Sequence, residues 1–332
     1  MKRILAFVLA LVTVLAFTAC GEKKEKNDPV TGGETDTPVT EDNTPVRVAA
    51  LAGSTGVGMA KLMDDGDYKV DIISEPTEMV AAMKTGKYDV AALPVNVAAK
   101  LYNMTNGGVQ VAALNTLGVL HVLVNGDVAI SSVKDLAGKT IYTTGEGATP
   151  QYILEYLLAA NDLQVGEDVT VVYEATADGV VAAMTNGTTD ICMLPEPKAT
   201  AVTMQIKTTK RVLDITEEWN KVCDTDVVQG CVVVGSEFAK NHKGALDKFL
   251  AAYKESVEFI AGNPEEGSVL VEKTGIIAKA AIAKAAIPGC NLVFIDGSEM
   301  KNTLSAFLTI LHTADAASVG GKLPDDAFYY QK

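Results

Sequence analysis

AAMTNGTTDICMLPEP (residues 182–197) repeats AAMKTGKYDVAALPVN (residues 81–96) at a constant spacing. Asp190 follows Asp89 by 101 residues, and Pro195 follows Pro94 by the same interval. Each copy runs from Ala-Ala-Met through a Gly and an Asp to a short apolar run that ends in Leu-Pro. The chain therefore contains a structural unit that is built twice.

The residues before each copy show the same order of expected elements. In the first copy, strands are predicted at 46–53, 68–74 and 89–94, with helices at 59–63 and 78–84. In the second copy, strands are predicted at 139–145, 168–174 and 190–195, with helices at 152–160 and 179–184. Strands that alternate with helices favour a parallel sheet, and nearly continuous apolar strands favour burial on both faces. The sequence predicts an α/β protein with two lobes, each a mostly parallel sheet flanked by helices.

Two further apolar runs, HVLV (121–124) and CVVV (231–234), are predicted to be the paired crossings between the lobes. The C-terminal stretch has helical stripes of apolar residues at 246–260 and at 304–311, and we expect them to pack back onto lobe one. Lobe one is thus predicted to span 46–122 plus 233–332, and lobe two 123–232.

The N-terminus has the order of a secretory signal peptide, predicted to span residues 1–20: a basic head, an apolar run too short to cross a membrane, and small residues before Cys20. A cysteine at this point resembles a bacterial lipobox, which implies lipidation of Cys20; the alternative is a cleaved signal with Cys20 unmodified. Residues 21–45 are polar, charged and free of aromatic residues, and they predict a disordered tether.

Composition narrows the class of protein. The 287 residues that follow the tether (332 − 45) predict two domains, and a net charge of −14 argues against a nucleic-acid partner. Besides Cys20 there are four cysteines, none in the C-x-x-C spacing of a zinc or redox site, so no metal is predicted. An exported protein permits disulfides, and the sequence leaves open whether any of these four pair: Cys192, Cys223, Cys231 and Cys290.

In open α/β sheets, ligands bind beyond the carboxyl ends of the strands, so two such lobes can face a cleft. Two Gly-rich strand-to-helix loops could hold a small anion or polar oxygen, although glycine could also serve the turn alone. Likewise Glu196 could simply cap a loop, and Trp219 could simply pack. The predicted ligand-binding residues are Ser54, Thr55, Gly56, Asn96, Asn115, Gly147, Ala148, Thr149, Glu196, Trp219 and Gln229.

The lipobox start, the duplicated lobe, TGEGATPQYILEYLL (144–158), DICMLPEP (190–197) and SVGGKLPDDAFYY (318–330) resemble solute-binding lipoproteins of ABC importers. The family is the nitrate/taurine/aliphatic-sulfonate and thiamine-precursor binding proteins. The resemblance implies a type II periplasmic-binding-protein fold, no cofactor, and a monomer anchored to the outer face of the cell membrane. It also implies a small-molecule ligand that touches Gly147, Ala148 and Thr149, and delivery to an ABC permease and ATPase. No arginine lies in a predicted cleft loop, which departs from a sulfonate site built on side-chain cations.

Two other classes of protein stay open. An enzyme is disfavoured because none of the three histidines adjoins a recognisable nucleophile, and His121 is expected to be a core residue. A biosynthetic enzyme for a thiamine precursor shares the implied fold but uses a histidine motif that we do not find. The other alternative is a lipid-anchored sensor domain, which a neighbouring permease and ATPase gene would argue against.

Overall fold

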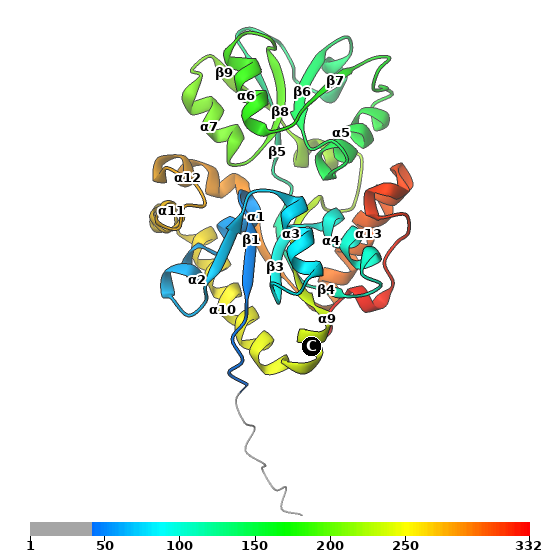
Figure 1. Ribbon diagram of the computed structural model, residues 1–332. Coiled ribbons are helices and arrows are strands. Elements are labelled where there is room, and N and C mark those ends of the chain that lie inside the picture. The colour runs from blue at the N-terminus through cyan, green and yellow to red at the C-terminus, as the bar shows by residue number, and fades with distance from the viewer. Residues whose placement is uncertain (1–41) are drawn as a thin grey trace, which may run out of the picture. The chain divides into compact units, whose positions relative to one another are not determined.

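The structure is a computed structural model that describes residues 42–332, all of which belong to one compact unit. Residues 1–41 lie outside the described part, and with them the predicted signal peptide, Cys20 and most of the predicted tether. The described chain forms two sheets, each flanked by helices, with the second sheet above the first in Figure 1. None of the helices within residues 42–332 has both the length and the apolar character needed to span a bilayer.

The first sheet has the strand order β11-β4-β10-β3-β1-β2. Its strands are β1 (Val48–Leu51), β2 (Val70–Ile73), β3 (Val90–Pro94), β4 (Val109–Leu117), β10 (Val228–Gly235) and β11 (Leu292–Ile295). β1 pairs in parallel with β2 and β3, whereas β10 lies antiparallel between β3 and β4. β11 completes the sheet antiparallel to β4.

The second sheet has the order β7-β6-β8-β5-β9. Its strands are β5 (Leu120–Asn125), β6 (Thr140–Thr144), β7 (Thr170–Glu174), β8 (Ile191–Pro195) and β9 (Thr209–Asp214). β6 is parallel to β7 and β8, and β5 is antiparallel to β8 and β9. The α/β class and the strand positions are confirmed. The sheets are mixed rather than mostly parallel, because β5, β10 and β11 run opposite to the repeated strands.

The repeat is confirmed element by element. α3 (Pro76–Lys84) and α6 (Ala177–Thr185) begin and end 101 residues apart, as do β3 and β8. The copies diverge after these strands, because α4 (Val95–Met104) begins directly after β3, whereas Glu196 and Pro197 precede α7 (Lys198–Gln205). Asn96 therefore lies in the first turn of a helix, whereas Glu196 lies in a short link between a strand and a helix.

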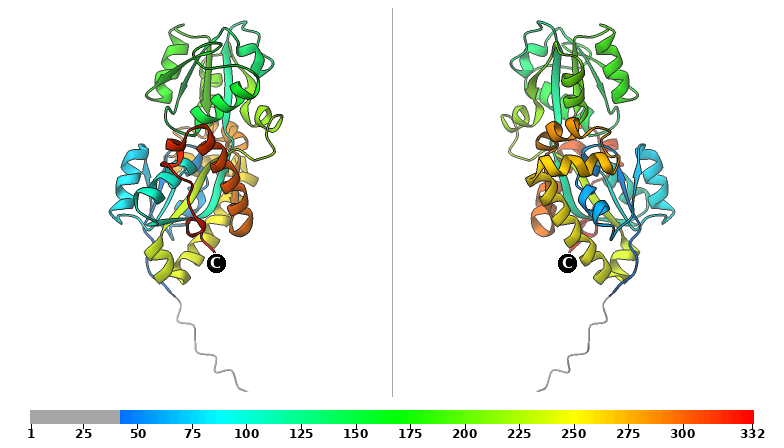
Figure 2. Two further views of the ribbon diagram at one scale, coloured as in Figure 1. Left: turned by 90° about the vertical axis from the view of Figure 1, so that its right-hand side faces the viewer. Right: turned by 90° about the vertical axis from the view of Figure 1, so that its left-hand side faces the viewer.

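The remaining helices flank the two sheets or lie in the links between strands (Figure 2). They are α1 (Ser54–Val57), α2 (Ala60–Asp65), η1 (Val133–Leu136), α5 (Thr149–Ala160), α8 (Ile215–Asn220), α9 (Ser236–Asn241), α10 (Lys243–Gly262), α11 (Pro264–Lys273), α12 (Ala280–Ala286), η2 (Ile287–Cys290), α13 (Gly297–Ala314), η3 (Ala316–Val319) and η4 (Asp326–Phe328). Leu246, Phe249 and Tyr253 of α10 share a buried cluster with Val48 and Val232 of the first sheet. The expected return of the C-terminal helices onto lobe one is thereby confirmed.

The chain passes between the sheets twice, at residues 118–119 and at residues 215–227. The runs expected to cross are β5 and β10, and each lies within one sheet. The predicted lobe boundaries at 122/123 and 232/233 stay a prediction about domains, and they fall inside these two strands. In the description of the structure, lobe one denotes the first sheet with its helices and lobe two the second sheet with its helices. The two passages touch, since a Cβ built on Gly118 would lie 2.1 Å from the Thr216 hydroxyl oxygen.

The four cysteines of the described residues are free thiols, and three of them are buried. Burial raises the pKa of Cys192 to about 12 and also raises that of Cys231. These two residues lie on β8 and β10 and act as small core residues.

Gly230 of β10 provides a test of how closely the elements of lobe one approach. A Cβ there would lie 2.5 Å from Thr55 Cγ2 and 2.6 Å from Asn115 Oδ1, so Gly230→Ala is expected to destabilise the fold by about 1–3 kcal/mol. Gly235→Ala on the same strand is the control, because its Cβ would meet nothing nearer than 3.8 Å. Urea unfolding of both variants measures the difference, and equal losses of unfolding free energy would contradict the prediction.

Candidate functional site

The carboxyl ends of the repeated strands deliver polar residues to the contact between the two lobes. β1 and β3 end at the same edge of the first sheet, and β6 and β8 at the same edge of the second, because parallel neighbours share their direction. The turns after β1 and β6 require glycine, since Gly53 has φ +100° and Gly145 has φ +90°. Each turn leads into a helix that faces the other lobe (Figure 1).

Two hydrogen bonds join the strand ends of the two lobes, and a third comes from α4. Ser54 Oγ donates to the Glu196 carbonyl oxygen at 2.6 Å, and Thr149 Oγ1 donates to Asn96 Oδ1 at 3.0 Å. Lys100 Nζ donates to the Gly147 carbonyl oxygen at 2.9 Å. The lobes are therefore closed on each other through polar groups. The predicted residues Ser54, Asn96, Thr149 and Glu196 are brought together and are at least nine-tenths buried.

Lobe one supplies a tightly packed wall. Asn115 is buried at the end of β4, and its Nδ2 donates to the Thr55 carbonyl oxygen at 3.2 Å and to the Tyr253 hydroxyl at 3.0 Å. Gly56 is pressed against the chain, because a Cβ there would lie 2.6 Å from the Leu51 carbonyl oxygen. Gln229 lies nearby on β10 and is partly buried. Asn115 is therefore held by lobe one itself.

In lobe two, the predicted ligand-binding residues Gly147, Ala148 and Thr149 lie at the start of α5. Gly147 is exposed and Ala148 half-buried, whereas Thr149 is fully buried as the first residue of the helix. Gly147 N–H donates to Gln151 Oε1 at 2.7 Å, so this donor is already used within lobe two. Thr149 is the member of this loop that reaches the other lobe.

Trp219 lies apart from these residues. It is fully buried on α8, with its ring centroid 4.6 Å from that of Tyr156 and 5.9 Å from that of Phe307. Its indole N–H donates to the Thr225 carbonyl oxygen. Tyr156 belongs to α5 and Phe307 to α13, so Trp219 packs between helices of the two lobes and offers no ring face for stacking.

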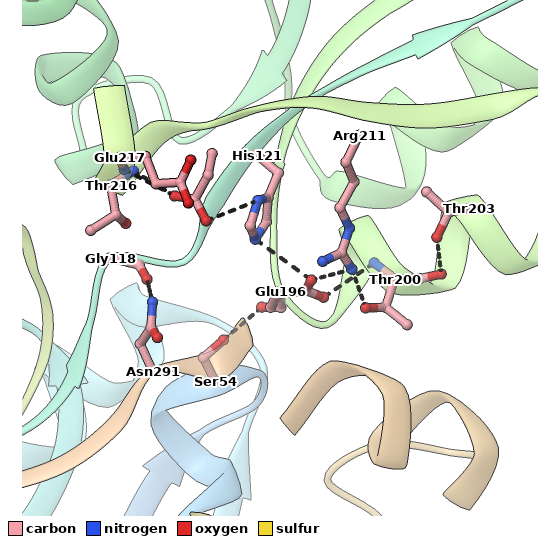
Figure 3. Close-up of polar contacts among 11 residues, drawn as sticks. Ser54, Gly118, His121, Glu196, Thr200, Thr203, Arg211, Thr216, Glu217 and Asn291 are labelled. Atoms are coloured by element: carbon pink, nitrogen blue, oxygen red, sulfur yellow. Dashed lines mark hydrogen bonds and ion pairs between the residues drawn. The ribbon is translucent and has the colours of Figure 1, made fainter. Parts of the chain in front are cut away.

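Glu196 lies at the centre of a group that we call the Glu196 cluster, defined as Glu196, Arg211, Thr200, His121 and Asp214 (Figure 3). Glu196, Thr200 and His121 are buried, Asp214 is partly buried and Arg211 is exposed. The Arg211 guanidinium forms an ion pair with Glu196 Oε1 and also donates to Thr200 Oγ1. The Thr200 backbone N–H, in the first turn of α7, donates to Glu196 Oε2 at 3.1 Å. The carboxylate is thus held by a cation and by a helix start.

His121 lies on the other side of the carboxylate, on β5. Its Nε2 is 3.7 Å from Glu196 Oε1, and its Nδ1 is 3.7 Å from Asp214 Oδ2. Asp214 also caps α8, because its Oδ1 accepts from the Thr216 N–H at 2.8 Å. His121 is therefore not the satisfied core histidine that the sequence suggested. It lies between two carboxylates at distances too long for hydrogen bonds.

Burial sets the titration of both groups. It lowers the pKa of His121, an effect that Asp214 opposes and Arg211 reinforces. Burial also raises the pKa of Glu196, and Arg211 and the bonds from Thr200 work against that rise. The lowered pKa favours a neutral His121, and the ion pair with Arg211 favours the ionised form of Glu196 against the rise that burial causes.

Four buried polar atoms at this contact make no hydrogen bond within the described residues. They are Asn96 Nδ2, His121 Nε2, Glu196 Oε1 and Gln229 Oε1. Of these four atoms, Glu196 Oε1 is contacted by the Arg211 guanidinium in an ion pair. Unsatisfied buried polar atoms are costly, and each asks for an explanation. A bound small molecule with donors and acceptors would satisfy them.

Arg211 and His121 were not among the predicted ligand-binding residues. The predicted residues came from strand-end loops, whereas Arg211 lies within β9 and pairs across the sheet with Leu123 of β5. β5 and β9 are separated by more than eighty residues, so no local pattern joins their side chains. The one usable signal was a charged residue inside the strand TKRVLD (209–214).

Comparison with known proteins places this geometry in a family. Residues 65–267 match the family described as NMT1/THI5 like. The chain belongs to the NMT1/THI5-like family. No curated protein matches it by sequence.

Solved structures of this architecture are similar to the chain. An ABC transporter protein from Parabacteroides distasonis has 22% identity and a TM-score of 0.75, and the match covers 87% of this chain and 100% of that one. The periplasmic aliphatic sulphonate-binding protein SsuA from Escherichia coli has 16% identity and a TM-score of 0.69, over 86% and 92%. The periplasmic nitrate-binding protein NrtA from Synechocystis has 15% identity and a TM-score of 0.57, over 80% of each. The two-lobed type II periplasmic-binding-protein fold is confirmed.

His121 predicts how stability depends on pH. Its usual pKa is 6.5 and its folded pKa is lower, so below pH 6.5 the unfolded chain binds a proton that the folded chain does not. Stability should therefore fall as the pH drops below 6.5. Between pH 7.5 and 5.5 the wild type should lose up to about 1 kcal/mol more unfolding free energy than His121→Asn.

Urea unfolding at the two pH values measures this difference. The variant keeps Glu196, whose raised pKa acts in the opposite direction, so the comparison isolates the histidine. Parallel pH dependence of the two proteins would refute the assignment.

Proposed function

We propose that this protein is the extracytoplasmic solute-binding component of an ABC importer, which captures a small polar molecule between its two lobes. The observation that carries the proposal is the layer of buried polar strand-end residues, contributed by both lobes, with unsatisfied atoms on each side. Such a layer favours a ligand over a dry domain interface, because apolar residues would stabilise a permanent contact at lower cost.

The similar structures support the same reading. The printed names of two of them are those of periplasmic proteins that bind an aliphatic sulphonate and nitrate. The ligand that we propose for this chain belongs to the same broad class of small nutrients, which includes sulfonates, nitrate and thiamine precursors. Two chain passages joining the lobes allow closure by a hinge motion around the ligand.

Binding is favoured over catalysis by the chemistry around Glu196. Cys290 lies close to Glu196 and Ser54, but burial raises its pKa to about 12, so its thiol stays protonated and a poor nucleophile. The Ser54 hydroxyl donates its hydrogen bond to the Glu196 carbonyl oxygen. His121 faces carboxylates on both sides instead of a serine or a thiol.

We further propose that Cys20 carries a lipid that holds the protein, as a monomer, at the outer face of the cell membrane, where it delivers its ligand to an ABC permease and ATPase. The order of the first 20 residues supports this anchor. A permease gene and an ATPase gene beside this one would favour the importer over a sensor.

Closure on a ligand is measurable with residues 42–332, which belong to one compact unit. Unfolding and refolding removes any bound ligand, and a panel then follows: taurine, alkanesulfonates, nitrate, pyrimidines, thiamine, riboflavin and amino acids. A solute at 100 times its Kd should stabilise the protein by about 2.7 kcal/mol and reduce its radius of gyration in small-angle scattering. Stabilisation without any change in that radius would contradict closure by a hinge.

Thr149→Arg tests the location of the site. Thr149 is fully buried against Asn96, so an arginine there should fill the space between the lobes and abolish the ligand-induced stabilisation. Thr188→Arg is the matched control, since this exposed threonine of lobe two lies in the link before β8, at the amino end of that strand, whereas Thr149 lies at the carboxyl end of the sheet. Unchanged binding by a folded Thr149→Arg variant would move the site elsewhere.

Cys20→Ala tests the anchor. The wild type should incorporate labelled palmitate and sediment with membranes, and the variant should do neither. Membrane sedimentation of both proteins alike would argue against lipidation at Cys20.

A further inference from the structure

The Glu196 carboxylate occupies a place that is built for an anion. It lies at the start of α7, a helix of eight residues, where it accepts the Thr200 N–H at 3.1 Å. The Arg211 guanidinium approaches from β9 and pairs with the same carboxylate. Proteins commonly bind a sulfonate, nitrate or phosphate with a cationic side chain and the N-terminus of a helix. Here the protein fills that place with its own side chain.

The charged groups around the Glu196 carboxylate disfavour the binding of a second anion. Arg211 contributes one positive charge, and Glu196 and Asp214 contribute two negative ones. His121 is neutral because burial lowers its pKa. Lys198, the first residue of α7, is turned to Asp178 on α6. The net charge around the carboxylate is therefore negative, and an entering anion would meet repulsion in a buried setting.

Glu196 faces both lobes. The Glu196 carbonyl oxygen accepts from Ser54 of lobe one, and a Cβ built on Gly289 of η2 would lie 3.2 Å from its Cγ and Oε1. Lobe one thus closes over the carboxylate (Figure 3). Any ligand that reaches Oε1 must lie between the lobes.

Two atoms of the cluster lack a hydrogen bond although their side chains are more than nine-tenths buried. They are Glu196 Oε1 and His121 Nε2, which lie 3.7 Å apart. Oε1 can only accept a hydrogen bond while the carboxyl is ionised. Arg211 contacts this oxygen, and a carboxylate oxygen accepts more than one hydrogen bond, so a further donor can bind there.

We propose that Glu196 excludes anionic solutes from this site, and that the ligand is a neutral or positively charged molecule that donates an N–H or O–H to the Glu196 carboxylate. This inference rests on the proposed function and specifies the ligand's chemistry. It sets the chain apart from the sulphonate- and nitrate-binding proteins that share its fold. Arg211 serves to position Glu196 rather than to bind the ligand.

The proposal predicts a gain of anion binding. Glu196→Ala empties the anion place while leaving Arg211 and the start of α7 intact. Methanesulfonate and nitrate should then raise the melting temperature of the variant saturably, compared with chloride at the same ionic strength. The double variant Glu196→Ala with Arg211→Ala should lose that gain. The same anions should give the wild type no shift beyond that of chloride.

Measurements on the wild-type protein test the proposal even if the alanine variant does not fold. A saturable shift of the wild type with methanesulfonate or nitrate would overturn it, and so would a folded Glu196→Ala variant that gains no anion binding. Any solute of the panel that does stabilise the wild type should bind Glu196→Gln at least tenfold more weakly, and equal affinity would overturn the donor assignment.

The two proposals fail in different ways. If the wild type closes on methanesulfonate or nitrate, the binding function stands and the exclusion of anions is wrong. If no solute produces closure, whatever its charge, the solute-binding function itself is wrong.

Discussion

Two short passages of the chain join the two sheets, and they are packed against each other. Gly118 in the first passage lies so close to Thr216 in the second that no side chain would fit, and the Asn291 amide donates to the Gly118 carbonyl oxygen from lobe one. Any relative motion of the lobes must bend both passages together. The strand ends on the two sides of this junction can therefore meet in few arrangements, and the site depends on that restriction.

The Glu196 cluster is not explained by stability. Burying the Glu196 carboxylate costs several kcal/mol, and its attraction to the exposed Arg211 guanidinium offsets this only when hydrogen bonds complete the geometry. Here Arg211 contacts one carboxylate oxygen from an exposed position, and the neighbouring histidine has an unused nitrogen. Apolar residues of similar volume would pack the same space at less cost. The cluster is better understood as a group kept for recognition, with Trp219 and its aromatic neighbours supplying the stable contact between the lobes.

The sequence predicted the repeat well because the repeat is local. Strands such as β3 and β8, and helices such as α3 and α6, follow from apolar patterns within ten residues. Ser54, Asn96, Thr149 and Glu196 followed in turn from the rule that parallel strands end at one edge. The Arg211–Glu196 pair could not be read this way, because the antiparallel pairing of β5 with β8 and β9 brings it together. Trp219 was misjudged for a similar reason, since its burial depends on α5 and α13, which are distant in sequence.

The two sides of the site are prepared differently for a ligand. On lobe one, Asn115 is fixed by Thr55 and Tyr253, and Gly230 leaves no space beside it, so this wall is preformed. Across the contact, Ser54 bonds to Glu196 and Asn96 to Thr149, so the closed lobes already satisfy part of what a ligand would offer. A ligand gains affinity only by the amount that its own bonds exceed these. The atoms left unsatisfied, Asn96 Nδ2 and Glu196 Oε1, are where that excess can arise, which favours a molecule that presents an acceptor to one and a donor to the other.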